Sequence, residues 1–375
     1  MTDILFFSHD PGGTNAIIPI YKKIRDKYRI MVYGKDFAIQ MWSKEGVKCE
    51  DISDYVQVLT EESICIFLAS ISPKLVITGT SFDDKTECMI WKSCKKLGVI
   101  HFAYVDSWMN YKMRFISSTD ENGNVLGYSF PDKILCVDEL AKNEMIFEGI
   151  PKKDLLVAGC WHLYYKKEKL ISIDSKDIME YRKRILGEKG EKRKKLLLFI
   201  SEPFTILYGE DSSSGLGYNE KSIFENIERV LCRIASPEMY TLVVRPHPKE
   251  NLKWWKSVAS RKTIPIVIDN ESSIECQIRS ADLIVGMYSQ CLNEAACIGK
   301  NIISVQIGRI SDDEPLMISK KHIINTLMDV ESLKNYIIDF FGGNTTPVFF
   351  EPYNDYCRLF EKYIEETLKS GEISN

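Results

Sequence analysis

A cationic loop lies in the second half of the sequence, where the run Val244-Arg-Pro-His-Pro-Lys249 places three basic side chains between prolines. The run directly follows a predicted strand over Thr241–Val244. Its two prolines restrict the backbone and so fix where the side chains point. The cations of Arg245, His247 and Lys249 suit a nucleotide phosphate, whose negative charge grows as a leaving group departs. A surface turn with incidental charge is the alternative, but a histidine between two prolines favours a binding role.

A glycine-rich segment, Phe6–Asn15, joins the first predicted strand to a helical pattern. Backbone N–H groups at such a helix start suit a phosphate, a carboxylate or a developing anion, and Gly12 and Gly13 would let a ligand approach them. The segment lacks the G-x-G-x-x-G spacing and the lysine of a P-loop, so a turn that needs glycine explains it equally well. His9 and Asp10 favour a function, because open α/β sheets bind ligands at the carboxyl ends of their strands. Either residue could be the general base that deprotonates an acceptor hydroxyl.

A third group follows the predicted strand Leu283–Val285 and opens a helix. Ser289 could cap that helix and offer its hydroxyl, together with backbone N–H groups and the neighbouring Gln290, to a phosphate. Glu294, one turn further on, could accept hydrogen bonds from two ribose hydroxyls. Alone, Ser289 would be a plain cap and Glu294 a solvated charge, so the combination carries the prediction.

Aromatic and charged residues mix in Tyr104–Phe115, which follows another predicted strand. Aromatic faces beside polar donors suit sugar recognition, although a buried aromatic cluster under a long loop would look the same. Asp106 in this segment is a second candidate base. No Asp-x-Asp metal motif appears, so we expect no metal ion and no required cofactor.

The elements that position these residues alternate between short apolar runs and amphipathic stretches. Continuous apolar strands between helices indicate parallel sheets that are covered on both faces. The alternation occurs twice, on either side of a polar, charged segment at 164–191. The predicted strands are Ile4–Ser8, Ile30–Tyr33, Leu75–Thr78, Val99–Val105 and Ile134–Val137, then Leu196–Ile200, Thr241–Val244, Pro265–Ile268, Leu283–Val285 and Ile302–Val305.

Length and composition fit this two-domain α/β plan. The chain has 375 residues, enough for two domains, and its net charge of -4 argues against a nucleic-acid partner. The eleven cysteines show no Cys-x-x-Cys pair or zinc spacing, and neither a signal peptide nor a spanning segment is apparent. We therefore expect a cytoplasmic protein. The basic run Glu188–Lys195 suits a solvated linker, while peripheral association with anionic lipid at the inner face of the membrane stays open. The sequence indicates no oligomeric state.

The spacing from Ser289 through Glu294 to Gly299, with a strand after it, resembles the donor half of glycosyltransferase B (GT-B) enzymes and of UDP-sugar 2-epimerases. The Arg245–Lys249 loop resembles the His-Pro motif of bacterial CMP-sialic-acid-using transferases and CDP-glycerol-type polyol-phosphate transferases. In those families the histidine and a later serine or threonine contact the donor phosphate, which maps onto His247 and Ser289. The resemblance covers the C-terminal half. In the N-terminal half it is architectural only, and the acidic motif that carries the sialyltransferase base has no clear counterpart.

The resemblance implies a GT-B fold, in which two Rossmann-like domains with parallel sheets face a central cleft. We expect an acceptor-side domain at 1–165 and a donor-side domain at 193–350. A C-terminal helix and tail at 351–375 would cross back to the first domain.

The expected function is that of an inverting, metal-independent glycosyltransferase. It would transfer a sugar, with a CMP-linked acidic sugar as first candidate, to a polysaccharide, glycan or glycolipid acceptor of the cell envelope. Asp10 or Asp106 would activate the acceptor, and His247 with its neighbours would stabilise the departing nucleotide. The alternatives are a CDP-linked polyol-phosphate transferase, a UDP-sugar 2-epimerase-like enzyme that needs no acceptor, and a binding module without catalysis.

Overall fold

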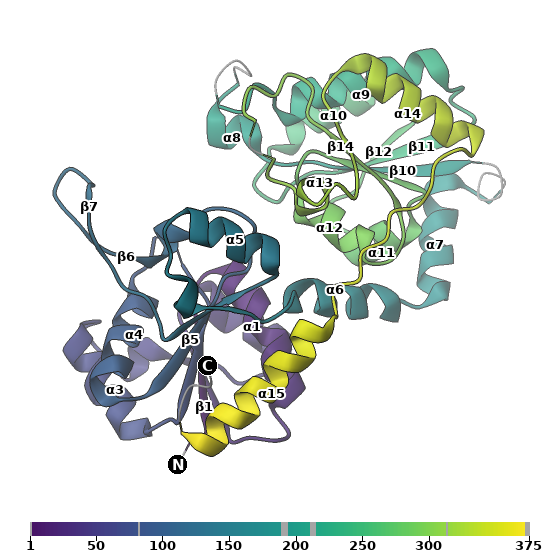
Figure 1. The fold of residues 1–375 in the computed structure, drawn as a ribbon. Helices are drawn as coiled ribbons and strands as arrows, with labels where there is room; N and C mark the ends of the chain where they lie inside the picture. Colours follow the sequence, from purple (N-terminus) through teal and green to yellow (C-terminus); the bar gives the residue numbers. More distant parts are fainter. Residues whose placement is uncertain (1, 82, 189–193, 211–214, 313, 372–375) are drawn as a thin grey trace. The chain divides into compact units, whose positions relative to one another are not determined.

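The structure is a computed structural model that describes residues 2–81, 83–188, 194–210, 215–312 and 314–371. The chain divides into two compact units, each of which holds its own sheet (Figure 1). Unit 1 comprises Met1–Tyr165 and Pro352–Asn375, and unit 2 comprises Lys166–Glu351. The boundary falls within helix α6 (Trp161–Ser172).

Unit 1 contains a parallel sheet of seven strands in the order β3-β2-β1-β4-β5-β8-β9. Its central strands consist almost wholly of buried apolar residues, which is what two covered faces require. The strands are β1 (Ile4–Ser8), β2 (Ile30–Gly34), β3 (Glu50–Asp51), β4 (Leu75–Thr78), β5 (Ile100–Tyr104), β8 (Lys133–Cys136) and β9 (Leu155–Val157).

Helices lie on both sides of the unit 1 sheet (Figure 1). They are α1 (Pro11–Ile24), α2 (Phe37–Lys44), α3 (Glu61–Ile71), α4 (Thr86–Leu97), α5 (Glu139–Phe147) and the C-terminal α15 (Asp355–Ser370). Short 3-10 turns, η1 (Ile52–Asp54), η2 (Lys112–Phe115) and η3 (Lys152–Asp154), connect some of these elements. An antiparallel hairpin of β6 (Ile116–Thr119) and β7 (Val125–Tyr128) projects from this unit.

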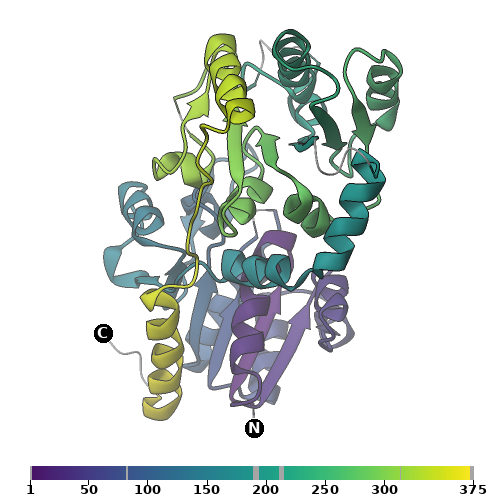
Figure 2. The same ribbon diagram turned by 90° about the vertical axis from the view of Figure 1, so that its right-hand side faces the viewer.

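The C-terminal helix α15 packs on unit 1, as both views show (Figures 1 and 2). Cys357, Phe360 and Ile364 form its buried face. Gly159 makes the approach possible, because a Cβ there would stand 2.3 Å from Cys357 Sγ and 2.9 Å from its backbone nitrogen. The chain therefore returns to its first unit at its end, as predicted.

Unit 2 contains a parallel sheet of six strands in the order β12-β11-β10-β13-β14-β15. These are β10 (Lys195–Ile200), β11 (Tyr240–Arg245), β12 (Ile266–Ile268), β13 (Leu283–Gly286), β14 (Asn301–Val305) and β15 (Thr326–Leu327). Figure 1 shows α9, α10 and α14 on one side of this sheet and α11 and α12 on the other. The helices of unit 2 are α7 (Ser175–Leu186), α8 (Phe204–Tyr208), α9 (Glu220–Ile234), α10 (Leu252–Ser260), α11 (Ile274–Ser280), α12 (Gln290–Ala296), α13 (Met317–Lys320) and α14 (Val330–Gly342).

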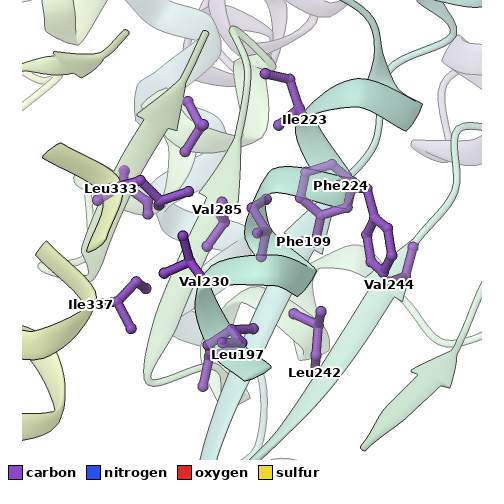
Figure 3. Packing of buried hydrophobic residues seen from close by; sticks show 14 of the residues in the cluster. Leu197, Phe199, Ile223, Phe224, Val230, Leu242, Val244, Val285, Leu333 and Ile337 are labelled. Atoms are coloured by element: carbon purple, nitrogen blue, oxygen red, sulfur yellow. The ribbon is translucent and has the colours of Figure 1, made fainter. Parts of the chain in front are cut away.

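The core of unit 2 lies between its sheet and the helix pair α9 and α14. Phe199, Val244 and Val285 from the strands meet Phe224 of α9 and Ile337 of α14 (Figure 3). This packing fixes the positions of β10, β11 and β13 in the core, and so it also fixes where the loops that follow these strands begin.

The strand order reverses once in each sheet, between β1 and β4 and between β10 and β13. Open α/β sheets bind ligands at such switch points, beyond the carboxyl ends of the strands. The predicted α/β class with two Rossmann-like parallel sheets is confirmed. The expected cleft between the two halves stays a prediction.

Among the described residues, no helix is both long and apolar enough to cross a membrane. Residues 189–193 of the basic run lie outside the described residues, so its predicted role as a linker or lipid contact stays a prediction. All eleven cysteines are free thiols.

Candidate functional site

Two glycines allow the chain to close tightly at the switch point of unit 1. A Cβ on Gly13 would stand 3.0 Å from Gly79 Cα, and a Cβ on Gly79 would stand 2.8 Å from Gly13 Cα. The sequence suggested that Gly12 and Gly13 form a turn before the helix, and this is wrong. They lie in the first turn of α1, which begins at Pro11, because proline suits the first helical position.

A pocket of about 410 Å³ opens at this switch point, within the size range of small-molecule sites. It brings together four residues that were predicted from the sequence, namely Asp10, Gly12, Gly13 and Asp106. Its wall contains two carboxylates, glycine backbone and the guanidinium of Arg114. The lining residues are Asp10, Pro11, Gly12, Gly13, Thr80, Asp106, Asn110, Met113 and Arg114.

Arg114 holds Asp106 in place within the pocket wall. Its Nη1 donates to Asp106 Oδ1 at 2.8 Å and to Thr80 Oγ1 at 3.0 Å, and its Nη2 donates to Ser107 Oγ at 2.9 Å. The other oxygen of Asp106 lies against α1, where a Cβ on Gly12 would come within 2.4 Å of it. Asp106 is thus a fixed carboxylate beside the positive end of a helix. Arg114 belongs to the segment Tyr104–Phe115, for which polar donors were predicted, but its pairing with Asp106 was not predicted because it depends on how η2 folds back.

His9 lies behind the pocket, and its side chain is between two carboxylates. Its Nε2 is 3.0 Å from Asp36 Oδ2 and forms a hydrogen bond with it. Its Nδ1 is buried and lies 3.0 Å from Asp10 Oδ1, without a hydrogen bond between the two. His9 is not among the lining residues, whereas Asp10 is.

Sequence reasoning missed Glu87, which is fully buried near the carboxyl end of β4. Ser81 Oγ donates to Glu87 Oε1 at 2.7 Å, and Glu87 Oε2 has no hydrogen-bond partner. Burial raises the pKa of Glu87 to about 7, with the nearby Asp84 adding to the effect. The pKa of this buried carboxyl group therefore lies close to neutral pH.

In unit 2, the predicted cationic loop lies between β11 and α10. Arg245 at the end of β11 donates from Nη1 to the carbonyl oxygen of Ser272, so its guanidinium is partly engaged within the unit. His247 is half-buried and Lys249 is exposed. The backbone N–H of His247 donates to Glu250 Oε1 at 2.9 Å. Glu250 is a second residue that sequence reasoning missed, although it is the next residue in the loop.

His247 is a neutral hydrogen-bond donor in this loop. The backbone N–H of Lys249 donates to its Nδ1 at 3.2 Å, so the ring proton belongs on Nε2. Burial, together with the charge of Lys249, lowers the pKa of His247. The ring can therefore donate through Nε2 to an anionic oxygen at neutral pH, without carrying a charge itself.

Ser289 precedes α12 as its cap, Gln290 is the first residue of the helix, and Glu294 lies one turn further on. Ser289 caps the helix, accepting from Cys291 N at 3.4 Å, and Gln290 Oε1 accepts from Asn293 Nδ2 at 2.7 Å. Glu294 is buried and pairs with Lys166 at 3.8 Å, so it is no solvated charge. Burial opposes the charge of Lys166, yet the carboxylates of Glu294 and Glu275 raise the pKa of this lysine.

Glu202, a third residue missed from the sequence, links the two strands at the switch point of unit 2. Its carboxylate follows β10 and accepts from the backbone N–H of Tyr288, beyond β13, at 2.9 Å. Burial raises the pKa of Glu202 to about 8. The backbone donors that the sequence suggested for a phosphate are thus partly used by this side chain.

The predicted residues therefore gather in two places. Asp10, Asp106, Gly12 and Gly13 line one pocket in unit 1 with His9 behind it, while the predicted nucleotide contacts follow β11 and β13 in unit 2. Within the described ranges, no group of three or more His, Cys, Asp or Glu side chains could hold a metal ion.

No protein-family model matches the sequence, and no curated protein matches it. Solved structures do match in fold. The UDP-GlcNAc 2-epimerase from Methanocaldococcus jannaschii has a TM-score of 0.66 at 14% identity, covering 98% of this chain and 99% of the other. The UDP-GlcNAc 2-epimerase from Neisseria meningitidis bound to UDP-GlcNAc gives 0.63 at 13% identity, with 98% and 100% coverage. Anabaena HepE in complex with UDP-glucose gives 0.56 at 10% identity, with 99% and 100% coverage.

These matches establish the fold, which is GT-B-like and extends over the whole of both chains. The prediction of a glycosyltransferase with a CMP-linked donor is wrong. The matching structures include UDP-GlcNAc 2-epimerases and favour the 2-epimerase-like alternative. The error has a physical cause, since a cationic loop and a capped helix serve any nucleotide sugar. Such motifs do not determine whether an acceptor hydroxyl or a sugar C–H loses its proton.

Proposed function

We propose that this protein is a UDP-sugar 2-epimerase-like enzyme, with UDP-GlcNAc as its first candidate substrate. The observation that carries the proposal is the end-to-end likeness to UDP-GlcNAc 2-epimerases, in which neither chain has a large unmatched part. The complex of Anabaena HepE with UDP-glucose makes UDP-linked hexoses as a class the wider expectation.

Unit 2 would bind the nucleotide. Nε2–H of His247 would donate to a diphosphate oxygen, and the exposed Lys249 would add positive charge. Arg245 already binds a backbone carbonyl within the unit, so we expect it to shape the loop as well as to attract the anion. Ser289, with the adjacent Gln290, would complete the phosphate contacts.

Glu294 would accept from the ribose hydroxyls, as a buried carboxylate beside Lys166 is able to do. A carboxylate has acceptor sites for both hydroxyls of a ribose. Its ion pair with Lys166 would hold it in place.

Unit 1 would handle the proton transfer. Inversion at C2 requires a proton to leave that carbon, and its electron pair would form a C1=C2 double bond as the C1–O bond to UDP breaks. Return of a proton to the opposite face of C2 and of UDP to C1 would complete the inversion with no net gain or loss of atoms. Asp10 and Asp106 line the same pocket, and a pair of carboxylates offers one group for each face. His9, whose Nδ1 lies 3.0 Å from Asp10 Oδ1, would orient Asp10, while Arg114 would hold Asp106 in orientation.

Nucleotide binding tests the first half of the proposal. Calorimetric titration with UDP, CMP and CDP should show that UDP binds most tightly. His247→Ala should weaken UDP binding by roughly tenfold to a hundredfold, because a hydrogen bond to a charged group contributes about 1.5–3 kcal/mol. Lys256→Ala is the matched control, since this exposed cation lies on α10 away from the loop. Equal or absent binding of the three nucleotides would contradict the proposal.

A further inference from the structure

Glu250 collects hydrogen bonds from three separate elements of unit 2. Its Oε1 accepts from the backbone N–H of His247 at 2.9 Å. Its Oε2 accepts from Trp255 Nε1 at 2.7 Å and from Ser201 Oγ at 3.0 Å. The carboxylate thus joins the β11–α10 loop to α10 and to the residue that follows β10.

The same residue closes the loop on itself. The backbone N–H of Glu250 donates to the carbonyl oxygen of His247 at 2.8 Å, while the side chain of Glu250 accepts from the N–H of His247. Pro246 and Pro248 have no N–H, so few other donors are available to hold this loop. The reciprocal pair therefore determines where the backbone of His247 lies.

The position of this backbone also controls the proton on the His247 ring. Lys249 N donates to His247 Nδ1 at 3.2 Å, within the turn whose backbone the two prolines and the Glu250 pair restrict. That contact leaves Nδ1 as the acceptor and Nε2 as the protonated nitrogen. Loss of the Glu250 carboxylate would free the turn, and both tautomers would then become populated.

We propose that Glu250 is a positioning residue that fixes both the place and the tautomer of His247, so that Nε2–H faces an anionic oxygen of the substrate. The identity of that anion as the diphosphate of a UDP-sugar rests on the proposed function. The assignment of Glu250 itself rests on the hydrogen bonds within unit 2.

A purely structural role for Glu250 would act through Trp255, which belongs to the buried core of the unit. The two roles use different oxygens of the carboxylate, so substitutions can separate them. Glu250→Ala removes both oxygens. Trp255→Phe removes one donor to Oε2 and leaves the bond between Oε1 and His247 N intact.

Glu250→Gln is the conservative variant. Its oxygen can stay on His247 N while its NH₂ group donates to Ser201 Oγ, so the Ser201 hydroxyl changes from donor to acceptor and Trp255 Nε1 loses its acceptor. The reverse orientation would leave His247 N and both amide hydrogens unsatisfied. We therefore expect the glutamine to preserve the position of His247.

The experiment combines imidazole NMR with UDP titration on the full chain. The sequence has five histidines, and the spectrum of His247→Ala identifies the signals of His247. In wild type, Glu250→Gln and Trp255→Phe, we expect the Nε2–H tautomer and UDP affinities within about threefold of one another. In Glu250→Ala, we expect mixed tautomers and about tenfold weaker UDP binding, as for one lost hydrogen bond. If that variant does not fold, Glu250→Leu keeps the volume and takes its place.

An unchanged tautomer and unchanged UDP affinity in Glu250→Ala or Glu250→Leu would overturn the inference. If Trp255→Phe lost as much UDP affinity as Glu250→Ala, the inference would also be overturned, because Glu250 would then act through its contact with Trp255 of α10 and not through His247. If wild type binds no UDP, the proposed function fails, and the tautomer still decides the role of Glu250.

Discussion

Individual residues of the unit 1 pocket depend on glycine for different reasons. At Gly12, an added Cβ would meet the end of a side chain, Asp106 Oδ2, at 2.4 Å. Gly12→Ala should therefore push Asp106 away from its place beside Arg114 and disturb the pocket without unfolding the unit. We expect turnover of UDP-GlcNAc to fall by more than tenfold, with a melting temperature within a few degrees of wild type. Steady-state kinetics and a thermal scan measure both quantities.

Gly13 offers the contrasting case, because an added Cβ there would meet backbone. The nearest atoms, Gly79 Cα and Thr80 N, both lie at 3.0 Å and cannot turn aside as a side chain can. Gly13→Ala should cost about 1–3 kcal/mol of unfolding free energy, the usual cost of overpacking. Chemical denaturation measures this cost. A Gly12→Ala variant that loses stability while Gly13→Ala does not would reverse our description of the pocket.

At the scale of the elements, Glu202 links the end of β10 to the end of β13 through its buried side chain. Burial favours the protonated form of this carboxyl group over the charged form. Glu202 has a pKa of about 8 in the folded protein against an ordinary value of 4.5. Between pH 4.5 and pH 8, Glu202 is therefore protonated in the native state but ionised in the unfolded chain. The contribution of Glu202 to stability is complete below pH 4.5 and is lost as the pH rises through 8.

We expect Glu202→Gln to flatten the fall in unfolding free energy between pH 5 and pH 8, by up to about 1.4 kcal/mol per pH unit. Denaturation at a series of pH values measures the slope, with Glu121→Gln on the exposed β6–β7 hairpin as the control. Parallel slopes for wild type and Glu202→Gln would show that Glu202 is ionised in the native state.

The C-terminal helix α15 is part of unit 1, because one of its faces is buried in the core of that unit. Phe360 is 1% exposed and meets Trp161 edge-on, whereas the adjacent Leu359 is 59% exposed. Phe360→Ala should destabilise unit 1 by about 3–5 kcal/mol, and Leu359→Ala should have almost no effect. Denaturation monitored by fluorescence measures both variants. A small effect of Phe360→Ala would mean that α15 is not anchored by this face.

For the molecule as a whole, the alternation of apolar strands and helices was enough to predict two α/β units with parallel sheets, while the GT-B type of fold was predicted from the resemblance to known families. The strands Ile4–Ser8 and Leu75–Thr78 have their predicted bounds, because runs buried on both faces carry an unambiguous signal. The first helix was predicted to begin at Ala16 but begins at Pro11, since proline and glycine are typical of turns as well as of first helical turns. The β6–β7 hairpin was also missed, because few of its residues are buried and its pattern is weak.

The candidate site could be predicted only in part. Parallel strands place their carboxyl ends at one edge, and this rule was enough to select Asp10, Asp106 and His247. The partners Arg114 and Glu250 could not be foreseen, because their roles come from hydrogen bonds that only the folded loops create. The reaction could not be foreseen either, since groups that bind phosphate are common to transferases and epimerases.

The most direct test of the central claim is to incubate the protein with UDP-GlcNAc alone in D₂O and to follow the sugar by proton NMR. We predict that the C2 epimer appears without any acceptor, and that deuterium enters at C2 because a proton must leave and return there. Asp10→Asn should slow both events. An unchanged sugar, or one that reacts only after an acceptor is added, would contradict the account.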